Sequence, residues 1–283
     1  MEDNFKINAD TTQQPLITET IIAQKIYGLC RQQDCLKPID STDTPPTTQY
    51  QQISSSLLGE ANSISGSALT GTINPNSIIS FNNTVASINV TDFKLSKIQV
   101  SKIEPNVFSS NGYWNITITY VFSYILNLLD SAGSPISVTL NTSPTTTPIT
   151  DINAYTTYEK NISLFGGGNG SSNSEVLLAN TLYNPTGTYI SSNEPYIEVQ
   201  AIANLLSYEI GTYVINTTTQ YQADLTIGLF TIIKAFRLVN LQLEGNINND
   251  IPLCDSIATT DPCEYFNEIP FPYDQFTPPQ NNE

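Results

Sequence analysis

Four cysteines are the residues of this sequence whose type and spacing could do chemistry. They lie at positions 30, 35, 254 and 263, one pair near each end of the 283-residue chain. An even number of cysteines indicates disulfides and allows three pairings. These are Cys30–Cys35 with Cys254–Cys263, Cys30–Cys254 with Cys35–Cys263, and Cys30–Cys263 with Cys35–Cys254. All four are therefore candidate cross-linking residues, and their partners stay open.

A bond between Cys30 and Cys35 would need a turn in the four residues between them. Five residues along a helix separate two Cα atoms by about 8 Å, and along a strand by about 16 Å. Both distances exceed the limit of roughly 7 Å for a disulfide. We therefore expect Cys30 and Cys35 to form disulfides with cysteines elsewhere rather than with each other.

Other chemistry fits these residues poorly. The cysteine pairs enclose four and eight residues, whereas structural zinc sites use two-residue knuckles and thioredoxin-like enzymes use C-x-x-C. The chain has no histidine, which excludes Ser-His-Asp and Cys-His catalysis. Carboxylates that could serve a glycosidase cannot be paired from sequence. We expect that the protein is not an enzyme and that it has no catalytic residue, no bound metal and no cofactor.

The charge balance excludes several classes of partner. The formal net charge is −16, from 26 acidic and 10 basic residues, and it repels nucleic acids and anionic membranes. No apolar run reaches the roughly 18 residues that span a bilayer. The chain opens with MEDNFKINADTTQQ, which lacks the features of a signal peptide. We expect a protein made in the cytosol, with neither nucleic acid nor membrane as partner.

Hydrophobic alternation predicts that β-strands position the cysteines. In residues 114–126 every even position from 116 is large and apolar, which indicates a strand with one buried face. A second alternating run, 136–140, follows a turn at 131–135 and predicts a hairpin. Residues 222–244 are apolar in both registers and should lie centrally or against a neighbouring subunit. We expect an all-β fold, a β-sandwich.

Composition divides the chain into four parts. Residues 1–24 begin with a polar stretch and indicate a flexible arm. Residues 25–52 hold two cysteines and a Pro/Thr-rich linker, although the run before Cys30 fits a helix or a strand. Residues 53–250 form the predicted β-sandwich, in which the Gly-rich stretch 166–174 is expected to be a solvated loop. Residues 251–283 form a tail rich in cysteine and proline.

The sequence KIYGLCRQQDCL at 25–36 resembles a short cysteine-bearing signature near the N-termini of clostridial spore-coat and endospore-appendage proteins. The run FNEIPFPY at 266–273 is similar to the tails of those proteins. The resemblance implies jelly-roll-like β-sandwich subunits joined by N-terminal connector arms and disulfides. It also implies synthesis in the mother-cell cytoplasm and deposition on the spore surface.

We therefore expect a structural, self-assembling subunit of a spore appendage or coat fibre. Its partners would be copies of itself in a homopolymer, together with other spore-coat or appendage proteins. Head-to-tail contacts that do not close generate filaments, and an arm that adds to a sheet edge would supply them. The alternative is a glycan-binding surface adhesin that uses exposed aromatic side chains, such as Tyr183, Tyr189 and Tyr196.

Overall fold

The computed structural model of the chain describes a set of ranges: 21–38, 52–53, 57–58, 62–106, 112–142, 145–167, 194–215, 218–241, 263, 266–267, 269–272 and 275–276. The elements that these ranges form are β-strands. The predicted all-β class is confirmed. Among the described residues, no helix is long and apolar enough to cross a bilayer.

The largest sheet has five strands and contains the first and the last long strand of the chain. Its order is β11 (Tyr196–Ile215), β12 (Thr218–Leu241), β1 (Ile21–Pro38) and β2 (Gln52–Ile53), and β5 (Ser80–Phe81) also pairs with β12. The long strands pair antiparallel, so β12 is hydrogen-bonded along both edges. We call this the first sheet.

The second sheet has four strands, in the order β3 (Leu57–Leu58), β10 (Ile152–Phe165), β7 (Tyr113–Leu129) and β6 (Ser87–Pro105). Every even residue of β7 from Trp114 to Leu128 is buried, and the odd residues are not. The predicted period of two is confirmed. β6 changes register at Leu95/Lys97, among other places, as a strand does at a β-bulge.

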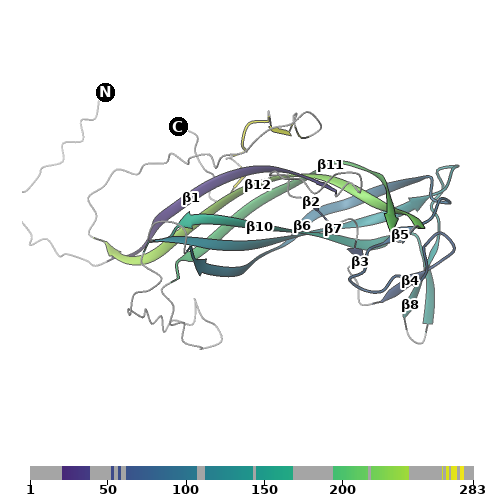
Figure 1. The fold of residues 1–283 in the computed structure, drawn as a ribbon, viewed down its shortest axis with the longest axis horizontal. Helices are drawn as coiled ribbons and strands as arrows, with labels where there is room; N and C mark the ends of the chain where they lie inside the picture. Colours follow the sequence, from purple (N-terminus) through teal and green to yellow (C-terminus); the bar gives the residue numbers. More distant parts are fainter. Residues whose placement is uncertain are drawn as a thin grey trace, which may run out of the picture.

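A third sheet of three short strands, β4 (Ser63–Ser65), β8 (Val138–Thr142) and β9 (Thr145–Ile149), lies at one end of the molecule (Figure 1). The prediction that 114–126 and 136–140 form a hairpin is wrong, apart from a contact at the turn between them. An isolated bridge joins Leu129 to Pro135, and the chain then leaves the second sheet to pair with β4 and β9. β7 pairs instead with β6 and β10.

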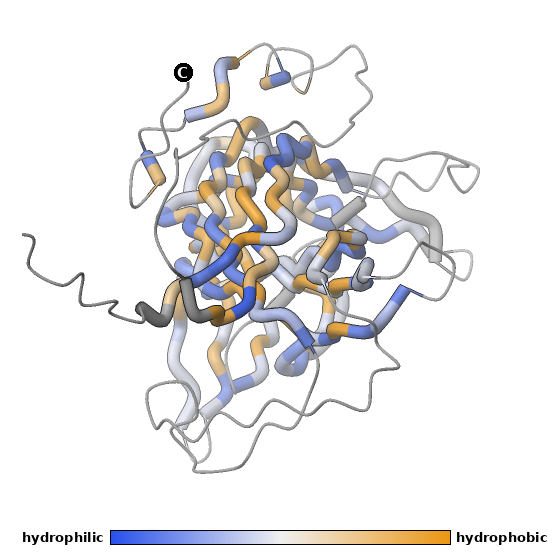
Figure 2. The backbone as a smooth tube through the Cα atoms, turned by 90° about the vertical axis from the view of Figure 1, so that its left-hand side faces the viewer, coloured by the Kyte–Doolittle hydropathy of each residue, from blue (hydrophilic) through white to orange (hydrophobic). Residues whose placement is uncertain are grey.

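The first and second sheets form two layers whose long strands follow the long axis of the molecule (Figure 1). A single core of buried residues joins them, with side chains from β1, β6, β7, β10 and β12. Seen along the long axis, hydrophobic and hydrophilic residues alternate along the strands (Figure 2). This arrangement of antiparallel sheets is compatible with a β-sandwich.

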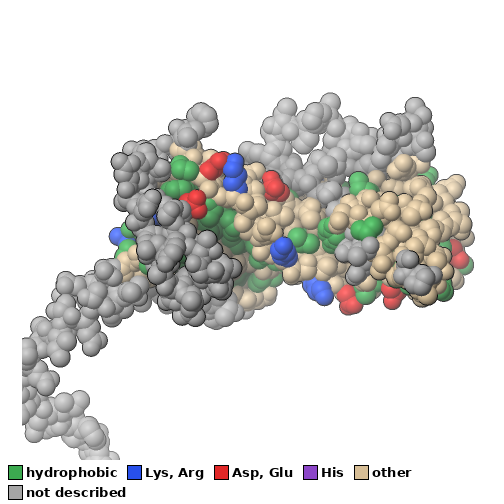
Figure 3. Space-filling model, turned by 90° about the horizontal axis from the view of Figure 1, so that it is seen from below, with side chains coloured by type: hydrophobic (Ala, Val, Ile, Leu, Met, Phe, Trp, Pro, Cys, Tyr) green, Lys and Arg blue, Asp and Glu red, His purple; other side chains and the backbone are tan. Residues whose placement is uncertain are grey.

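The outer surface is supplied mainly by uncharged groups. Only 13% of the residues are charged, about half the usual share. The face in Figure 3 shows mostly neutral polar side chains and backbone, with a few separate lysines, arginines and acidic residues.

The boundaries of the β-structure differ from those expected. β1 begins at Ile21 and ends at Pro38, so the last four residues assigned to the arm, and residues 25–38 of the cysteine-bearing segment, belong to the first sheet. β1 also changes register between Ile26 and Gly28, which hides its alternation in the sequence. Gly28 lies so close to β10 that an added Cβ would be 2.4 Å from the carbonyl oxygen of Phe165.

Candidate functional site

The two N-terminal cysteines lie on opposite faces of β1. Cys30 is buried at 6% exposure in the core between the sheets. Cys35 faces outward and packs against a second group of apolar side chains, which we call the outer cluster. Because β1 continues from Ile21 to Pro38, the turn that a Cys30–Cys35 bond requires is absent there.

Cys35 forms a disulfide with Cys263. Their Cα atoms are 5.3 Å apart, and the residues are 228 positions apart in sequence. Of the three possible pairings, only Cys30–Cys254 with Cys35–Cys263 contains this bond. Cys254 lies outside the described residues. The structure thus joins Cys35 and Cys263 within one chain, whereas the family resemblance implies disulfides that join subunits.

The disulfide attaches the C-terminal segment, which we define as the described residues within 263–276, to the outer face of the first sheet. In Figure 1 this segment lies above β1 and β12. Its phenylalanines join the outer cluster, whose fully buried members are Phe230, Ile232, Phe266 and Phe276. The outward face of β12 is therefore covered by the chain itself, and this accounts for a strand that is apolar in both registers.

Ring contacts hold the outer cluster together. Phe230 of β12 lies 4.6 Å from Phe266 and 5.3 Å from Phe271, measured between ring centroids. Phe271 stacks on Phe276 at 5.4 Å. Such pairs add about 0.5–1.5 kcal/mol each to the free energy of burial. The phenylalanines at 266, 271 and 276 are spaced five residues apart, and this regular spacing is the sequence signal of the segment.

Polar groups of β1 fix the same segment. The Gln33 side-chain amide donates a hydrogen bond to the carbonyl oxygen of Phe266 and a longer one, 3.5 Å, to that of Ile269. The Arg31 guanidinium lies 5.7 Å from the ring centroid of Phe271. The residues Arg31 to Cys35 thus bind the C-terminal segment with every outward-facing side chain.

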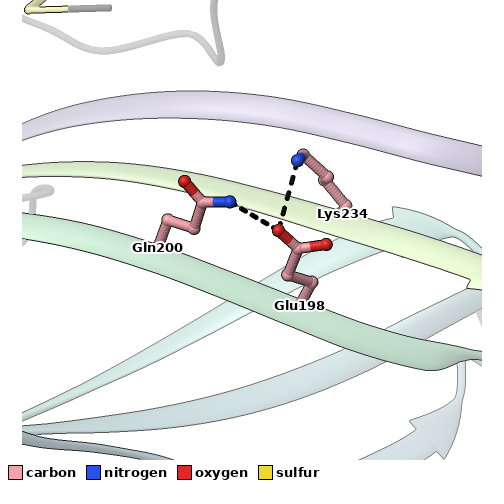
Figure 4. Close-up of polar contacts among 3 residues, drawn as sticks. All are labelled: Glu198, Gln200 and Lys234. Carbon is pink, nitrogen blue, oxygen red and sulfur yellow. Dashed lines mark hydrogen bonds and ion pairs between the residues drawn. The ribbon is translucent and has the colours of Figure 1, made fainter. Parts of the chain in front are cut away.

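A polar group lies further along the same face. Glu198 on β11 accepts hydrogen bonds from Gln200 at 2.5 Å and from Lys234 on β12 at 3.2 Å (Figure 4). In the ladder between β12 and β1, Lys234 lies opposite Leu29, and Leu29 packs against the outer cluster. This group marks the polar border of the apolar face.

The Gly-rich stretch begins inside the structure. Gly166 and Gly167 are buried, and their carbonyl oxygens accept hydrogen bonds of 2.7 and 2.6 Å from Arg237. Trp114 also donates to Gly167, at 3.4 Å. Burial lowers the pKa of Arg237. The expectation of a solvated loop is wrong for these two residues, and residues 168–174 lie outside the described ranges.

The outer side of the second sheet carries a cavity of 520 Å³. Polar and aromatic side chains line it, including Asp92, Lys94, Asn153 and Tyr155. Of the tyrosines proposed to hold glycans, Tyr183 and Tyr189 lie outside the described residues. Tyr196 stacks on Phe236 at 5.4 Å.

No family model, curated protein or solved structure matches this chain. Within the described ranges, no group of three or more histidine, cysteine or acidic side chains is placed to hold a metal ion.

Proposed function

We propose that the protein is a structural, self-assembling subunit of a spore-surface appendage or coat fibre, with a jelly-roll-like β-sandwich. The observation that carries the proposal is the disulfide-linked C-terminal segment on the outer face of the first sheet. A segment that docks on a preformed face and is fixed there by one bond can dock equally on another copy. Exchange of an identical element between copies is a common route to assembly.

The chain length between the sheet and the cysteine permits this exchange. Residues 242–262 connect the end of β12 to Cys263, and an extended chain of that length reaches about 70 Å. Cys263 of one subunit could thus meet Cys35 of the next with all the contacts of the outer cluster preserved. Cys30 is buried in the core, which leaves Cys254 as a further cross-linking residue between subunits.

The resemblance of residues 25–36 to spore-appendage signatures supports the same assignment. The spore surface is the location that it implies, with oxidation of the cysteines after release. The connector arm would consist of residues 1–20, since β1 begins at Ile21. Its deletion should shorten or abolish filaments, and unchanged polymerisation would exclude the arm as the connector.

Segment exchange is tested with two complementary variants, Cys35→Ser and Cys263→Ser, both carrying Cys254→Ser. Neither can close the bond within its own chain. When the two are mixed and oxidised, Cys263 of one should bond to Cys35 of the other, and a non-reducing gel should show dimers that disappear with reductant. Each variant alone is the control and should stay monomeric under the same conditions.

Wild-type protein should form longer disulfide-linked ladders and filaments visible by electron microscopy. A mixture that stays monomeric would exclude exchange of the C-terminal segment. Wild-type protein without multimers or filaments under oxidising conditions would exclude the fibre function itself.

A glycan-binding adhesin is the second candidate, and the 520 Å³ cavity on the second sheet favours it. Tyr155 lines the cavity, its hydroxyl donates a hydrogen bond to Asn76, and an aromatic ring is the kind of group on which sugars stack. A glycan array probed with wild-type protein and with Tyr155→Ala tests this function. Binding that the substitution abolishes would support it, and an array without signal would exclude it.

A further inference from the structure

A lysine–aspartate pair connects the two sheets through the core. Lys160 lies on β10 of the second sheet and Asp34 on β1 of the first, and the Lys160 ammonium contacts a carboxylate oxygen of Asp34. Only 8% of the Lys160 side chain and 22% of the Asp34 side chain are exposed. A charged pair with so little water costs free energy unless it is neutralised or bonded.

Two other ion pairs of the described region show how unusual this one is. Lys102 and Glu104 lie on one strand and are 61% and 46% exposed. Lys234 and Glu198 are 12% and 37% exposed and lie on neighbouring strands of one sheet (Figure 4). Of these three ion pairs, only the pair of Lys160 and Asp34 joins the second sheet to the first.

The cross-strand partners of the two residues are apolar, and the same region also holds the phenols of Tyr120 and Tyr158 and the buried polar atoms of Gln32 and Thr231. Lys160 lies opposite Ile118 of the neighbouring strand β7, and Asp34 lies opposite Leu229 of the neighbouring strand β12. Ile118 and Leu229 are fully buried. Tyr158 precedes Lys160 by two residues on the same face of β10, and its ring stacks on that of Tyr120 at 5.9 Å. Such an environment excludes the water that normally keeps an ammonium and a carboxylate apart.

Both phenols can act as proton donors. Burial, followed by the negative charge of Asp34, raises the pKa of Tyr158, and the same two causes raise the pKa of Tyr120. The phenols therefore stay protonated at neutral pH. Within the described residues the hydroxyl of Tyr158 has no hydrogen-bond partner, which leaves it available for an oxygen that gains charge.

We propose that Lys160 and Asp34 condense to an isopeptide bond that joins the two sheets covalently. One proton moves from Nζ of Lys160 to the Asp34 carboxylate, which gives a neutral amine and a carboxylic acid. The Nζ lone pair then attacks Cγ, and a neighbouring phenol stabilises the oxygen on which negative charge develops.

The bond between Cγ and the hydroxyl oxygen breaks, and that hydroxyl leaves as water with a second proton from Nζ. One C–N bond replaces one C–O bond. No electrons are transferred, and the reaction requires no oxidant, metal or cofactor.

The fold supplies both the rate and the direction of this reaction. The reacting groups are already in contact, so the step is intramolecular, for which effective concentrations are very high. In water, hydration of the separate ions favours hydrolysis of an amide. In the core much of that hydration is lost, and burying a neutral amide costs far less than burying two separate ions.

The mass of the full-length protein, purified, fully reduced and denatured, tests the proposal. The expected species is lighter than the sequence mass by one water. Lys160→Arg, which keeps the charge but not the nucleophilic amine, and Asp34→Ala should both have their full sequence masses. Lys234→Arg is the matched control at another ion pair and should still lack one water.

Peptide fragmentation should then identify a branched peptide that contains both Asp34 and Lys160. The proposal is overturned if the wild-type protein shows only its full sequence mass. It is equally overturned if the missing water persists in Lys160→Arg or maps to another pair of residues. The wild-type measurement decides even if a variant fails to fold.

Discussion

The ring of Phe266 lies directly against Gly228, so that a Cβ added to this glycine would be 2.4 Å from Cε2 of the ring. Gly228 is also the partner of Cys35 across the β1–β12 ladder. The absence of a side chain at one position of β12 therefore makes room for the C-terminal segment beside the cysteine that fixes it.

Gly228→Ala should displace the C-terminal segment. The methyl group cannot fit unless Phe266 moves, and overpacking of this kind costs about 1–3 kcal/mol. We expect a lower melting temperature and faster reduction of the Cys35–Cys263 bond, measured by thiol labelling. Gly66→Ala is the control, because its nearest atom would be 3.5 Å away. Equal reduction rates in wild type and Gly228→Ala would contradict this packing.

Cys263→Ser should destabilise the oxidised protein by about 2–5 kcal/mol, since the bond closes a very long loop. Under oxidising conditions the melting temperature of the variant should lie below that of wild type. With reductant the difference should disappear. A difference of the same size in both conditions would mean that the serine disturbs packing and that the bond itself contributes little.

Alkaline pH should destabilise the fold through its buried tyrosines. Burial raises the pKa of Tyr120 and of Tyr158 above the ordinary value of 10.0. Unfolded phenols therefore lose their protons at a lower pH than folded ones. Stability should be unaffected below pH 10 and fall above it, by about 1.4 kcal/mol per pH unit for each phenol.

Denaturant unfolding across this pH range measures the effect, with Tyr158→Phe as the comparison. The variant should show a shallower fall above pH 10. An unchanged slope would show that Tyr158 ionises without unfolding.

Arg237→Lys should loosen the start of the Gly-rich stretch. Arginine reaches the carbonyl oxygens of Gly166 and Gly167 with two nitrogens, whereas lysine has one. We expect a loss of about 1–3 kcal/mol in the free energy of unfolding and faster proteolysis after residue 167. Lys102→Arg, at an exposed position, should change neither. Unaltered proteolysis of Arg237→Lys would exclude this role.

Alternation of apolar and polar residues predicted those strands that keep one face toward the core along their whole length. β7 is the clearest case, because one face meets the core at every second residue. The two-faced apolar character of β12 correctly predicted a central strand. It could not tell that the chain's own phenylalanines, rather than another subunit, cover the outer face.

The sequence did not identify β1 as a strand, because the alternation of its inward and outward residues is interrupted. Ile26 pairs with Phe236 and Gly28 with Ala235, so the register shift exchanges the inward and outward parities between them. The bond of Cys35 to Cys263 and the contact of Asp34 with Lys160 join residues 228 and 126 positions apart. No local spacing encodes such contacts, since they depend on how whole sheets stack.

The Cys35–Cys263 bond also determines how the subunit would respond to being pulled. Tension applied to the two ends of the chain follows the shortest covalent path, which crosses from residue 35 directly to residue 263. The polypeptide between these positions, with almost all of both layers, then bears no load. In a subunit whose own bond is closed, stretching would separate β1 from β12 only up to Cys35, and the rest of the folded body would stay intact.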